Sequence, residues 1–209
     1  MAAALCVLLG GVGVGAEIAA QPAPAQESGG SPAAGAPGDR AAPVPTLEAL
    51  LGRIGGRPRQ QARFSERKFV AVLDAPVESA GVLRYEAPGR LEKTTERPRP
   101  ETMLLDGDAL VLQRDGRRRS LPADQLPGVA ALVGALRDTL AGDAQSLRRL
   151  FRVVVQGSEA SWQIDLLPLD AASAELVSRI TLRGSADSLR EIETLQADGD
   201  RSVMLLSPL

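Results

Sequence analysis

The sequence is poor in the side chains on which most enzyme chemistry depends. It has no histidine, and its one cysteine, Cys6, lies in an apolar run at the N-terminus. The commonest general base, the usual zinc ligands and a thiol nucleophile are therefore missing from the rest of the chain. Serine is present, but without the Gly-x-Ser-x-Gly turn that exposes a hydrolase nucleophile. These residues predict a protein that is not an enzyme and that holds no metal or cofactor.

Aliphatic residues dominate the sequence instead, and they favour the binding of apolar groups. Apolar residues make up 44% of the chain, yet aromatic residues make up only 2%, so stacking on nucleic-acid bases is not expected. The 24 basic and 26 acidic residues almost cancel, which leaves no overall field to attract nucleic acid. We therefore expect no nucleic-acid partner. We expect instead that apolar groups bind by transfer from water into an apolar interior, which contributes about 0.8 kcal/mol for each buried CH₂ group.

Two N-terminal segments precede the part of the chain that is expected to fold. Residues 1–25 combine an Ala, Leu, Val and Gly run with an Ala-x-Ala-like site before Gln26, which is typical of a cleaved secretory signal, although no basic residue follows Met1. The alternative is a disordered Ala-rich tail. Residues 26–45 are rich in Pro, Ala, Gly and Ser and predict a disordered linker. One domain is expected over residues 46–209.

This domain is predicted to begin with a helix and to continue with short antiparallel strands. Leu47, Leu50, Leu51 and Ile54 follow Thr46 with helical spacing, which predicts a helix over residues 47–54. Gly, Pro and Asp turns then separate short apolar runs, and Asp115-Gly116 is typical of a hairpin. Six strands are expected, over residues 62–73, 79–86, 90–96, 101–105, 109–113 and 117–121.

Two helices are predicted to interrupt the strands in the middle of the domain. A stripe of apolar residues runs along residues 128–140, between Pro127 and Gly142, and a shorter helix is expected over residues 143–151. Strands are then expected over residues 151–156, 161–167, 175–183, 188–197 and 201–206. About eleven antiparallel strands with inserted helices predict an α+β fold rather than a parallel sheet.

Several of these strands are apolar on both faces, which indicates that each face is covered. Residues 103–105, 110–112 and 203–206 lack the alternation of a sheet with one face in water. One explanation is a sheet packed between the helix over 47–54 and the helix over 128–140. The other is a curled sheet that encloses an aliphatic cavity, with a helix as its cover. The pattern alone is compatible with both.

Four stretches of the sequence, taken in order and spacing, carry a family resemblance. They are residues 64–68, 81–91, 97–110 and 180–202. Their succession resembles the strands of the LolA-type outer-membrane lipoprotein carriers over about residues 46–207. The resemblance implies a highly curved, half-open β-barrel with a helical lid over an apolar cavity that receives acyl chains. It also implies a periplasmic protein that takes lipoproteins from an inner-membrane transporter and passes them to an outer-membrane acceptor. We expect it to be a monomer.

The sequence departs from these carriers at several positions. Ala87 stands where the carriers have an Arg that is implicated in holding the lid closed, and only Arg90 is nearby. Arg84, Lys93 and Val111 occupy places where the carriers have Trp and Phe in their early strands. Two other functions therefore stay open: a carrier of a glycolipid or another acyl species, and an envelope module that senses lipid and regulates a partner.

The candidate binding residues follow from the expected lid and cavity. The lid is expected to present Val129, Leu132, Val133, Leu136 and Leu140. The cavity wall is expected to contain Leu83, Tyr85, Leu91, Met103, Leu105, Leu110, Leu112, Ile180, Leu182 and Met204. Each of these residues is also compatible with an ordinary core position.

Two further features of the sequence are ambiguous. Residues 117–119 are three consecutive arginines, which suit an acidic partner or phospholipid headgroups but also a solvated sheet edge that discourages pairing. Trp162 is expected to fill the core rather than to form a ligand platform.

Overall fold

The computed structural model describes residues 43–107, 109–122 and 125–209. The predicted signal over residues 1–25 lies outside this part of the chain, and so do all but the last three residues of the predicted linker over residues 26–45. These two segments, and the domain boundary at residue 46, stay predictions.

All eleven strands of the described residues form one antiparallel sheet. They are β1 (Arg59–Phe69), β2 (Val77–Glu86), β3 (Arg90–Arg97), β4 (Glu101–Asp106), β5 (Ala109–Arg114), β6 (Arg117–Pro122), β7 (Phe151–Ser158), β8 (Ser161–Pro168), β9 (Val177–Ser185), β10 (Ser188–Gln196) and β11 (Arg201–Pro208). Their order in the sheet is β6-β5-β4-β3-β2-β1-β11-β10-β9-β8-β7.

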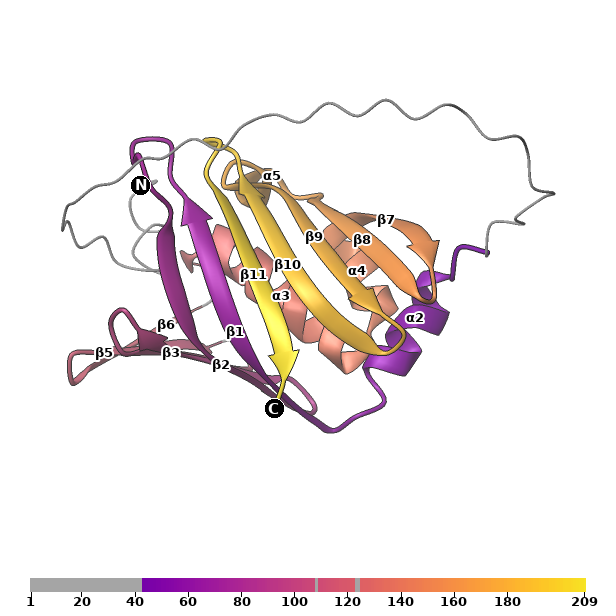
Figure 1. Ribbon diagram of the computed structural model, residues 1–209, viewed down its shortest axis with the longest axis horizontal. Coiled ribbons are helices and arrows are strands. Elements are labelled where there is room, and N and C mark those ends of the chain that lie inside the picture. Colours follow the sequence, from indigo (N-terminus) through magenta and orange to yellow (C-terminus); the bar gives the residue numbers. More distant parts are fainter. Residues whose placement is uncertain (1–42, 108, 123–124) are drawn as a thin grey trace, which may run out of the picture.

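The sheet is strongly curved but not closed. Its two edge strands, β6 and β7, do not pair with each other, whereas β1 and β11 are neighbours in its middle. Figure 1 shows that β3 to β6 turn away from the surface formed by β7 to β11. The predicted fold class, an α+β protein built on a highly curved, half-open antiparallel barrel of about eleven strands, is confirmed.

Three helices lie together on the concave face of the sheet. They are α2 (Leu47–Ile54), α3 (Pro127–Ala141) and α4 (Ala144–Leu150), which contact one another behind the sheet in Figure 1. Thr46 starts α2, because its Oγ1 accepts a hydrogen bond from the Ala49 amide at 3.2 Å. Since α3 contacts both β3 and β9, it spans the interior of the curve. The alternative in which the helix over 47–54 and the helix over 128–140 cover opposite faces of the sheet is therefore wrong.

Two elements differ from the sequence-based prediction. The first strand ends at Phe69 rather than at residue 73, because the chain turns there and the Leu73 amide donates to the Val70 carbonyl at 2.9 Å. A short helix, α5 (Ala171–Ala174), was not predicted and delays the next strand to Val177. The hairpin at Asp115-Gly116 is confirmed, with φ of 50° and 71° at these two residues.

The α5 helix depends on one acidic cap. The Asp170 side chain accepts a hydrogen bond from the Ser173 amide at 2.8 Å, and this bond, together with one to the Ser173 side chain, lowers the pKa of Asp170. The stabilisation is therefore present above the ordinary pKa of 3.8 and is lost as the pH falls through the lower folded value. Asp170→Ala should cost about 0.5–1 kcal/mol in urea unfolding at pH 7, since the cap is exposed. A cost that does not shrink in acid would contradict this role.

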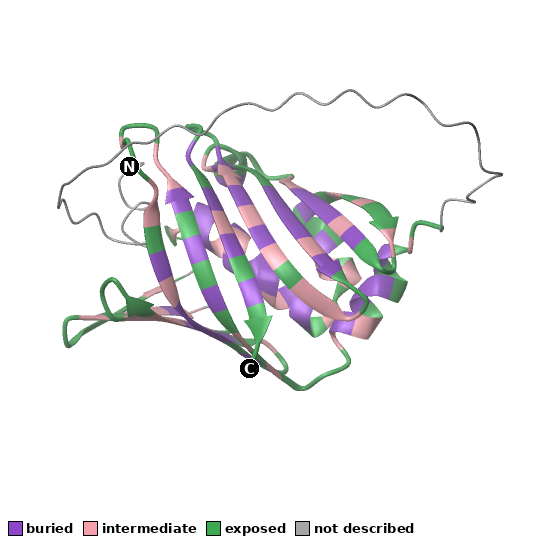
Figure 2. Cartoon of the chain, in the orientation of Figure 1, coloured by how far each residue is buried: buried purple, intermediate pink, exposed green. Residues whose placement is uncertain are grey.

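Buried and exposed residues alternate along several strands, as the colours of Figure 2 show. On β1, Phe64, Glu66 and Lys68 are buried on the inner face, and the residues between them are exposed. The expectation that strands with two apolar faces are covered on both sides is wrong. Leu205 is 51% exposed on the outer face, where no described helix packs.

A tryptophan and a glycine fix the packing of β8 against β9. Trp162 is buried directly opposite Gly184, and its indole N–H donates to the Ala186 carbonyl at 3.1 Å. A Cβ atom on Gly184 would lie 2.2 Å from Trp162 Cζ2 and 2.2 Å from the Ser188 carbonyl oxygen. The expected core role of Trp162 agrees with this burial.

Gly184→Ala should therefore destabilise the domain by about 1–3 kcal/mol, because Trp162 must move to accommodate the methyl group. The measurement is the free energy of unfolding in urea. Gly52→Ala is the matched control: that position lies in α2 with open space around it, so alanine should stabilise by about 0.5–1 kcal/mol. Equal stability of the two variants would refute the packing argument.

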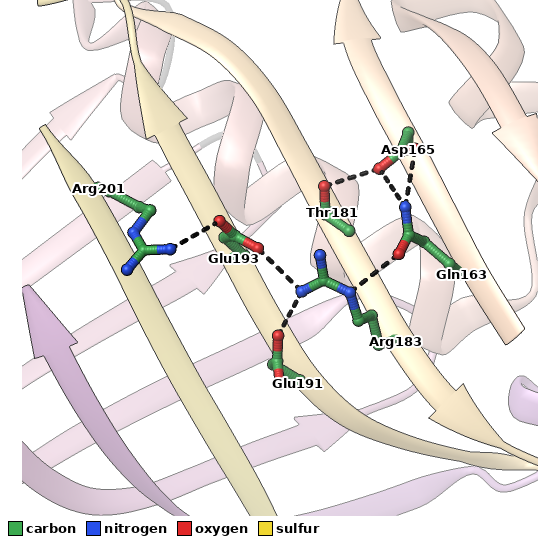
Figure 3. A network of polar contacts seen from close by, with 7 residues as sticks. All are labelled: Gln163, Asp165, Thr181, Arg183, Glu191, Glu193 and Arg201. Atoms are coloured by element: carbon green, nitrogen blue, oxygen red, sulfur yellow. Dashed lines mark hydrogen bonds and ion pairs between the residues drawn. The ribbon is translucent and has the colours of Figure 1, made fainter. Parts of the chain in front are cut away.

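The outer face of β8 to β11 carries a continuous polar network (Figure 3). Arg183 donates to Gln163 Oε1 at 2.9 Å, to Glu193 Oε2 at 2.8 Å and to Glu191. Thr181 donates to Asp165 at 2.7 Å on the same face. Burial alone would lower the pKa of Arg183, but its hydrogen bonds to Glu193 and Glu191 raise it. Arg201 of β11 donates to Glu193 Oε1 at 3.5 Å, so the network links four adjacent strands on the side away from the helices.

Candidate functional site

A small enclosed cavity lies between α3 and the inner face of the sheet. Its volume is about 40 Å³, and Leu83 belongs to its wall. The cavity brings together seven of the fifteen predicted binding residues: Leu83, Leu91, Met103 and Met204 from the strands and Leu132, Val133 and Leu136 from α3. Residues from β2, β3, β4 and β11 thus meet one face of α3.

A larger pocket of about 280 Å³ opens at the end of the sheet where β1 begins and β11 ends. Leu83 also belongs to this pocket, so it separates the pocket from the enclosed cavity. Tyr85 and Leu140 are the other predicted binding residues in its lining. Charged pairs surround this mouth pocket: Arg57 with Asp187, and Arg59 with Glu86 at 2.8 Å.

Six predicted residues line neither space. Val129, Leu105, Leu110, Ile180 and Leu182 are buried in the common core, and Leu112 packs against it while half-buried. All fifteen residues therefore pack in the interior, but these six are not brought to a cavity in this conformation. The binding role of the whole set stays a prediction.

Polar residues in the cavity wall were missed by reasoning from the sequence. Lys93 Nζ lies 2.6 Å from Glu66 Oε2, and the two side chains are only 8% and 2% exposed. Ser79 donates to the same carboxylate oxygen at 3.3 Å, and Lys93 Nζ lies 4.9 Å from the centre of the Phe64 ring. The sequence could have predicted the inward position of Glu66. It lies two residues after Phe64 on a strand, so both side chains face the same side of the sheet.

The substitutions relative to the carriers have different structural consequences. Arg84 points outward and forms an exposed ion pair with Glu92 at 2.9 Å. Val111 is half-buried beside Leu104 in the β4–β5 ladder. Lys93 alone enters the cavity. Of these three positions, only Lys93 therefore changes the lining of the cavity.

The two ends of α3 are held in different ways. At its C-terminal end, Gln60 Nε2 donates to the Leu140 carbonyl at 3.3 Å and to the Ile54 carbonyl of α2 at 3.0 Å. Gly142 ends the helix in the left-handed conformation, with φ of 78°. At its N-terminal end, Leu126 provides no side-chain cap, and the first turn contains no acidic residue. Polar anchors therefore hold the C-terminal end of α3.

Arg90 does not reach α3. Its guanidinium pairs with Asp106 at 3.6 Å and with Glu92 at 3.9 Å, on the surface of β3 and β4. The arginine beside the β2–β3 turn is Arg137 of α3, because a Cβ atom on Gly89 would lie 3.2 Å from Arg137 Cδ. Burial raises the pKa of Tyr85 nearby, with Arg137 lowering it and Asp138 raising it further. An arginine of α3, and not Arg90, therefore lies against this turn.

The three consecutive arginines lie at an edge of the sheet. Residues 117–119 lie on β6, an edge strand of the sheet, and all three are exposed. In the part of the chain that the structure describes, no helix is long and apolar enough to cross a membrane.

An open, strongly curved antiparallel sheet, with a helix lying across its apolar interior, defines a half-barrel with a covered interior. The chain belongs to the family described as outer membrane lipoprotein carrier protein LolA-like, which matches residues 41–208. The resemblance expected from the sequence is thereby confirmed.

Several solved structures have a similar fold at low sequence identity. A LolA superfamily protein from Nitrosomonas europaea is 10% identical with a TM-score of 0.45, and the match covers 78% of this chain and 92% of the other. A putative outer membrane lipoprotein-sorting protein domain from Vibrio parahaemolyticus is 10% identical with a TM-score of 0.43, covering 78% and 92%. The Mycobacterium tuberculosis lipoprotein LppX is 12% identical with a TM-score of 0.41, covering 77% and 93%. No curated protein matches the chain.

Proposed function

We propose that this protein is a non-enzymatic carrier in the bacterial periplasm that binds the acyl chains of a lipoprotein or of another lipid. In this proposal the signal over residues 1–25 directs export, the segment over residues 26–45 is a linker, and the domain over residues 46–209 carries the cargo. The carrier receives its cargo from an inner-membrane transporter and delivers it to an outer-membrane acceptor. Family membership and the cavity beneath α3 support the proposal.

The single observation that carries the proposal is the position of α3. Leu132, Val133 and Leu136 of this helix form one side of the enclosed cavity, and Leu83 and Met204 face them from the sheet. Transfer of an acyl chain into such surroundings is favourable by about 0.8 kcal/mol for each CH₂ group. A chain of ordinary length therefore supplies several kcal/mol of binding energy without any polar contact.

The size of the cavity implies that α3 moves when cargo binds. Pockets that hold small ligands usually measure about 300–1,000 Å³, and the enclosed cavity has about 40 Å³. The mouth pocket has about 280 Å³. Because the polar anchors lie at the C-terminal end of α3, beside the mouth pocket, we propose that the N-terminal end of α3 swings outward and enlarges the enclosed cavity. A few kcal/mol between the closed and open states is enough to leave both populated.

Native mass spectrometry with lipid extraction tests the proposal on protein purified from an envelope fraction. The expected result is an acylated species bound to a chain that begins at or near Gln26. The mass of that species distinguishes a lipoprotein from a glycolipid or free acyl species. An empty protein that also fails to bind fatty-acid probes would overturn the carrier and favour a packed core with a regulatory partner. A chain that retains Met1 would overturn export through this signal.

A further inference from the structure

The two lysines of this chain occupy an unusual place. Lys68 and Lys93 are the only lysines in the sequence, and every other basic residue is an arginine. Both lysine side chains are buried on the inner face of the sheet. Lysine is almost never fully buried unless it is paired. Lys93 meets this condition through Glu66, at 2.6 Å, but Lys68 does not.

Lys68 is an unpaired ammonium group inside the fold. The residue is 2% exposed, and its Nζ has neither a hydrogen bond nor an ion pair with any described residue. A buried ammonium is costly unless a counter-charge or a hydrogen-bond acceptor reaches it. The Gln196 Nε2 atom is a second buried donor without a partner in the described part of the chain. Two hydrogen-bond donors on the inner face thus lack an acceptor.

The strand register places Lys68 at the end of the interior opposite the mouth pocket. Along β1 and β11, Ala62 pairs with Pro208 at the mouth, Glu66 pairs with Met204 at the enclosed cavity, and Lys68 pairs with Ser202. Ser202 also lines the enclosed cavity. The six residue-to-residue steps from Ala62 to Lys68 span roughly 20 Å. One acyl chain occupies about half of a bilayer's ~30 Å hydrocarbon core, so it fits this length.

The polar groups at this inner end favour an anion. Lys68 and Gln196 supply free donors, and the hydroxyl groups of Ser202 and Thr194 add two more that face the same interior. Two buried carboxylates lie near this end, and both already have partners: Glu66 is paired with Lys93 and accepts a bond from Ser79, and Asp200 accepts a bond from the Ala71 amide at 3.0 Å. A carboxylate or phosphate oxygen would be the acceptor that Lys68 lacks, through a charge-assisted hydrogen bond.

We infer that the interior binds a single-chain acyl lipid with an ionised carboxylate or phosphate monoester head, and that this head pairs with Lys68. The tail then runs from Lys68 past Met204 toward the mouth pocket. This inference rests on the proposed function, because it requires that the interior accept an acyl chain. The inference adds two features to the proposed function: the ligand binds with its head group buried, and that head group carries a negative charge.

Competition binding on the delipidated full domain tests the charge of the ligand. Palmitate, hexadecyl phosphate and methyl palmitate are titrated against a bound neutral fluorescent acyl probe. Palmitate or hexadecyl phosphate should bind about 10- to 100-fold more tightly than the neutral ester, as expected for a hydrogen bond to a charged group. The tighter of the two anions identifies the head group.

Variants assign the effect to Lys68. Lys68→Met should remove the preference for the anions and leave the affinity for methyl palmitate unchanged, which also shows that the variant is folded. Its melting temperature should not fall, because the substitution removes an unpaired buried charge. If methionine prevents folding, Lys68→Gln removes the same charge and carries the same test. Arg67→Met, on the exposed side of the same strand, is the control and should change neither affinity.

The outcomes separate this inference from the carrier proposal. Equal affinity of the wild-type protein for palmitate, hexadecyl phosphate and methyl palmitate would overturn the anionic head and leave the carrier standing. A preference for anions that survives in Lys68→Met would overturn the role of Lys68. Failure of all three ligands to bind would overturn both proposals.

Discussion

Lys93→Met is expected to lower the free energy of unfolding by about 3–5 kcal/mol, because it leaves the Glu66 carboxylate buried without its counter-charge. The Glu66 side chain is 2% exposed, and Lys93 Nζ lies 2.6 Å away. Urea denaturation of the domain measures the change. A double variant, Glu66→Gln with Lys93→Met, should recover much of the loss, since neither remaining side chain carries a charge that needs pairing.

Arg84→Met provides a matched control, because Arg84 on β2 pairs with Glu92 on β3, the strand that also carries Lys93. Arg84 pairs with Glu92 at 2.9 Å, but the Arg84 side chain is half exposed. Exposed ion pairs contribute about 0–1 kcal/mol, so this variant should unfold almost as the wild-type protein does. If Lys93→Met were no more destabilising than Arg84→Met, burial of the Glu66–Lys93 pair would have no energetic consequence. The contrast with Lys68→Met, which should not destabilise, adds a second comparison.

Leu136→Asp is expected to abolish acyl binding while the strand content stays intact. Leu136 is buried and lines the enclosed cavity on α3. An ionised carboxylate at that place costs several kcal/mol unless the helix moves it into water. A helix that can swing outward would relieve the cost, but the cavity would then lose its apolar cover. Far-UV circular dichroism measures strand content, and displacement of a fluorescent acyl probe measures binding.

Leu150→Asp is the control for the lid. Leu150 lies at the end of α4, next to α3, and is 43% exposed, so a carboxylate there stays in contact with water. Acyl binding should be within about twofold of the wild-type protein for this surface substitution. Global unfolding of Leu136→Asp would mean that Leu136 is an ordinary core residue, and α3 would then not act as a movable lid.

Local sequence signals were sufficient to predict most of the elements. The Asp115-Gly116 turn places β5 beside β6 because two adjacent residues accept positive φ. The apolar stripe of α3 and the left-handed Gly142 at its end were also readable from spacing alone. The four-residue helix α5 was missed because its single turn is too short to show a helical period. In each case the decisive interactions lie within a few residues along the chain.

The candidate site was predicted less completely. Leu132 and Met204 meet in the enclosed cavity as expected, whereas Ile180 and Leu182 are buried away from it. Met204, Ile180 and Leu182 all lie on the inner face of the sheet, so alternation along a strand cannot separate them. The curvature of the sheet and the path of α3 decide which inner residues border a space. Those features depend on packing between elements that are distant in sequence.

By itself, the sequence determined the strands, the main helices and the family, because turn residues, apolar periods and their succession are properties of neighbouring positions. The tertiary structure alone decided that Glu66 and Lys93, from different strands, form a buried pair, and that Lys68 has no such partner among residues 43–107, 109–122 and 125–209. The physical reason is the cost of burying charge. That cost arises only when a curved sheet and its helices exclude water from the inner face.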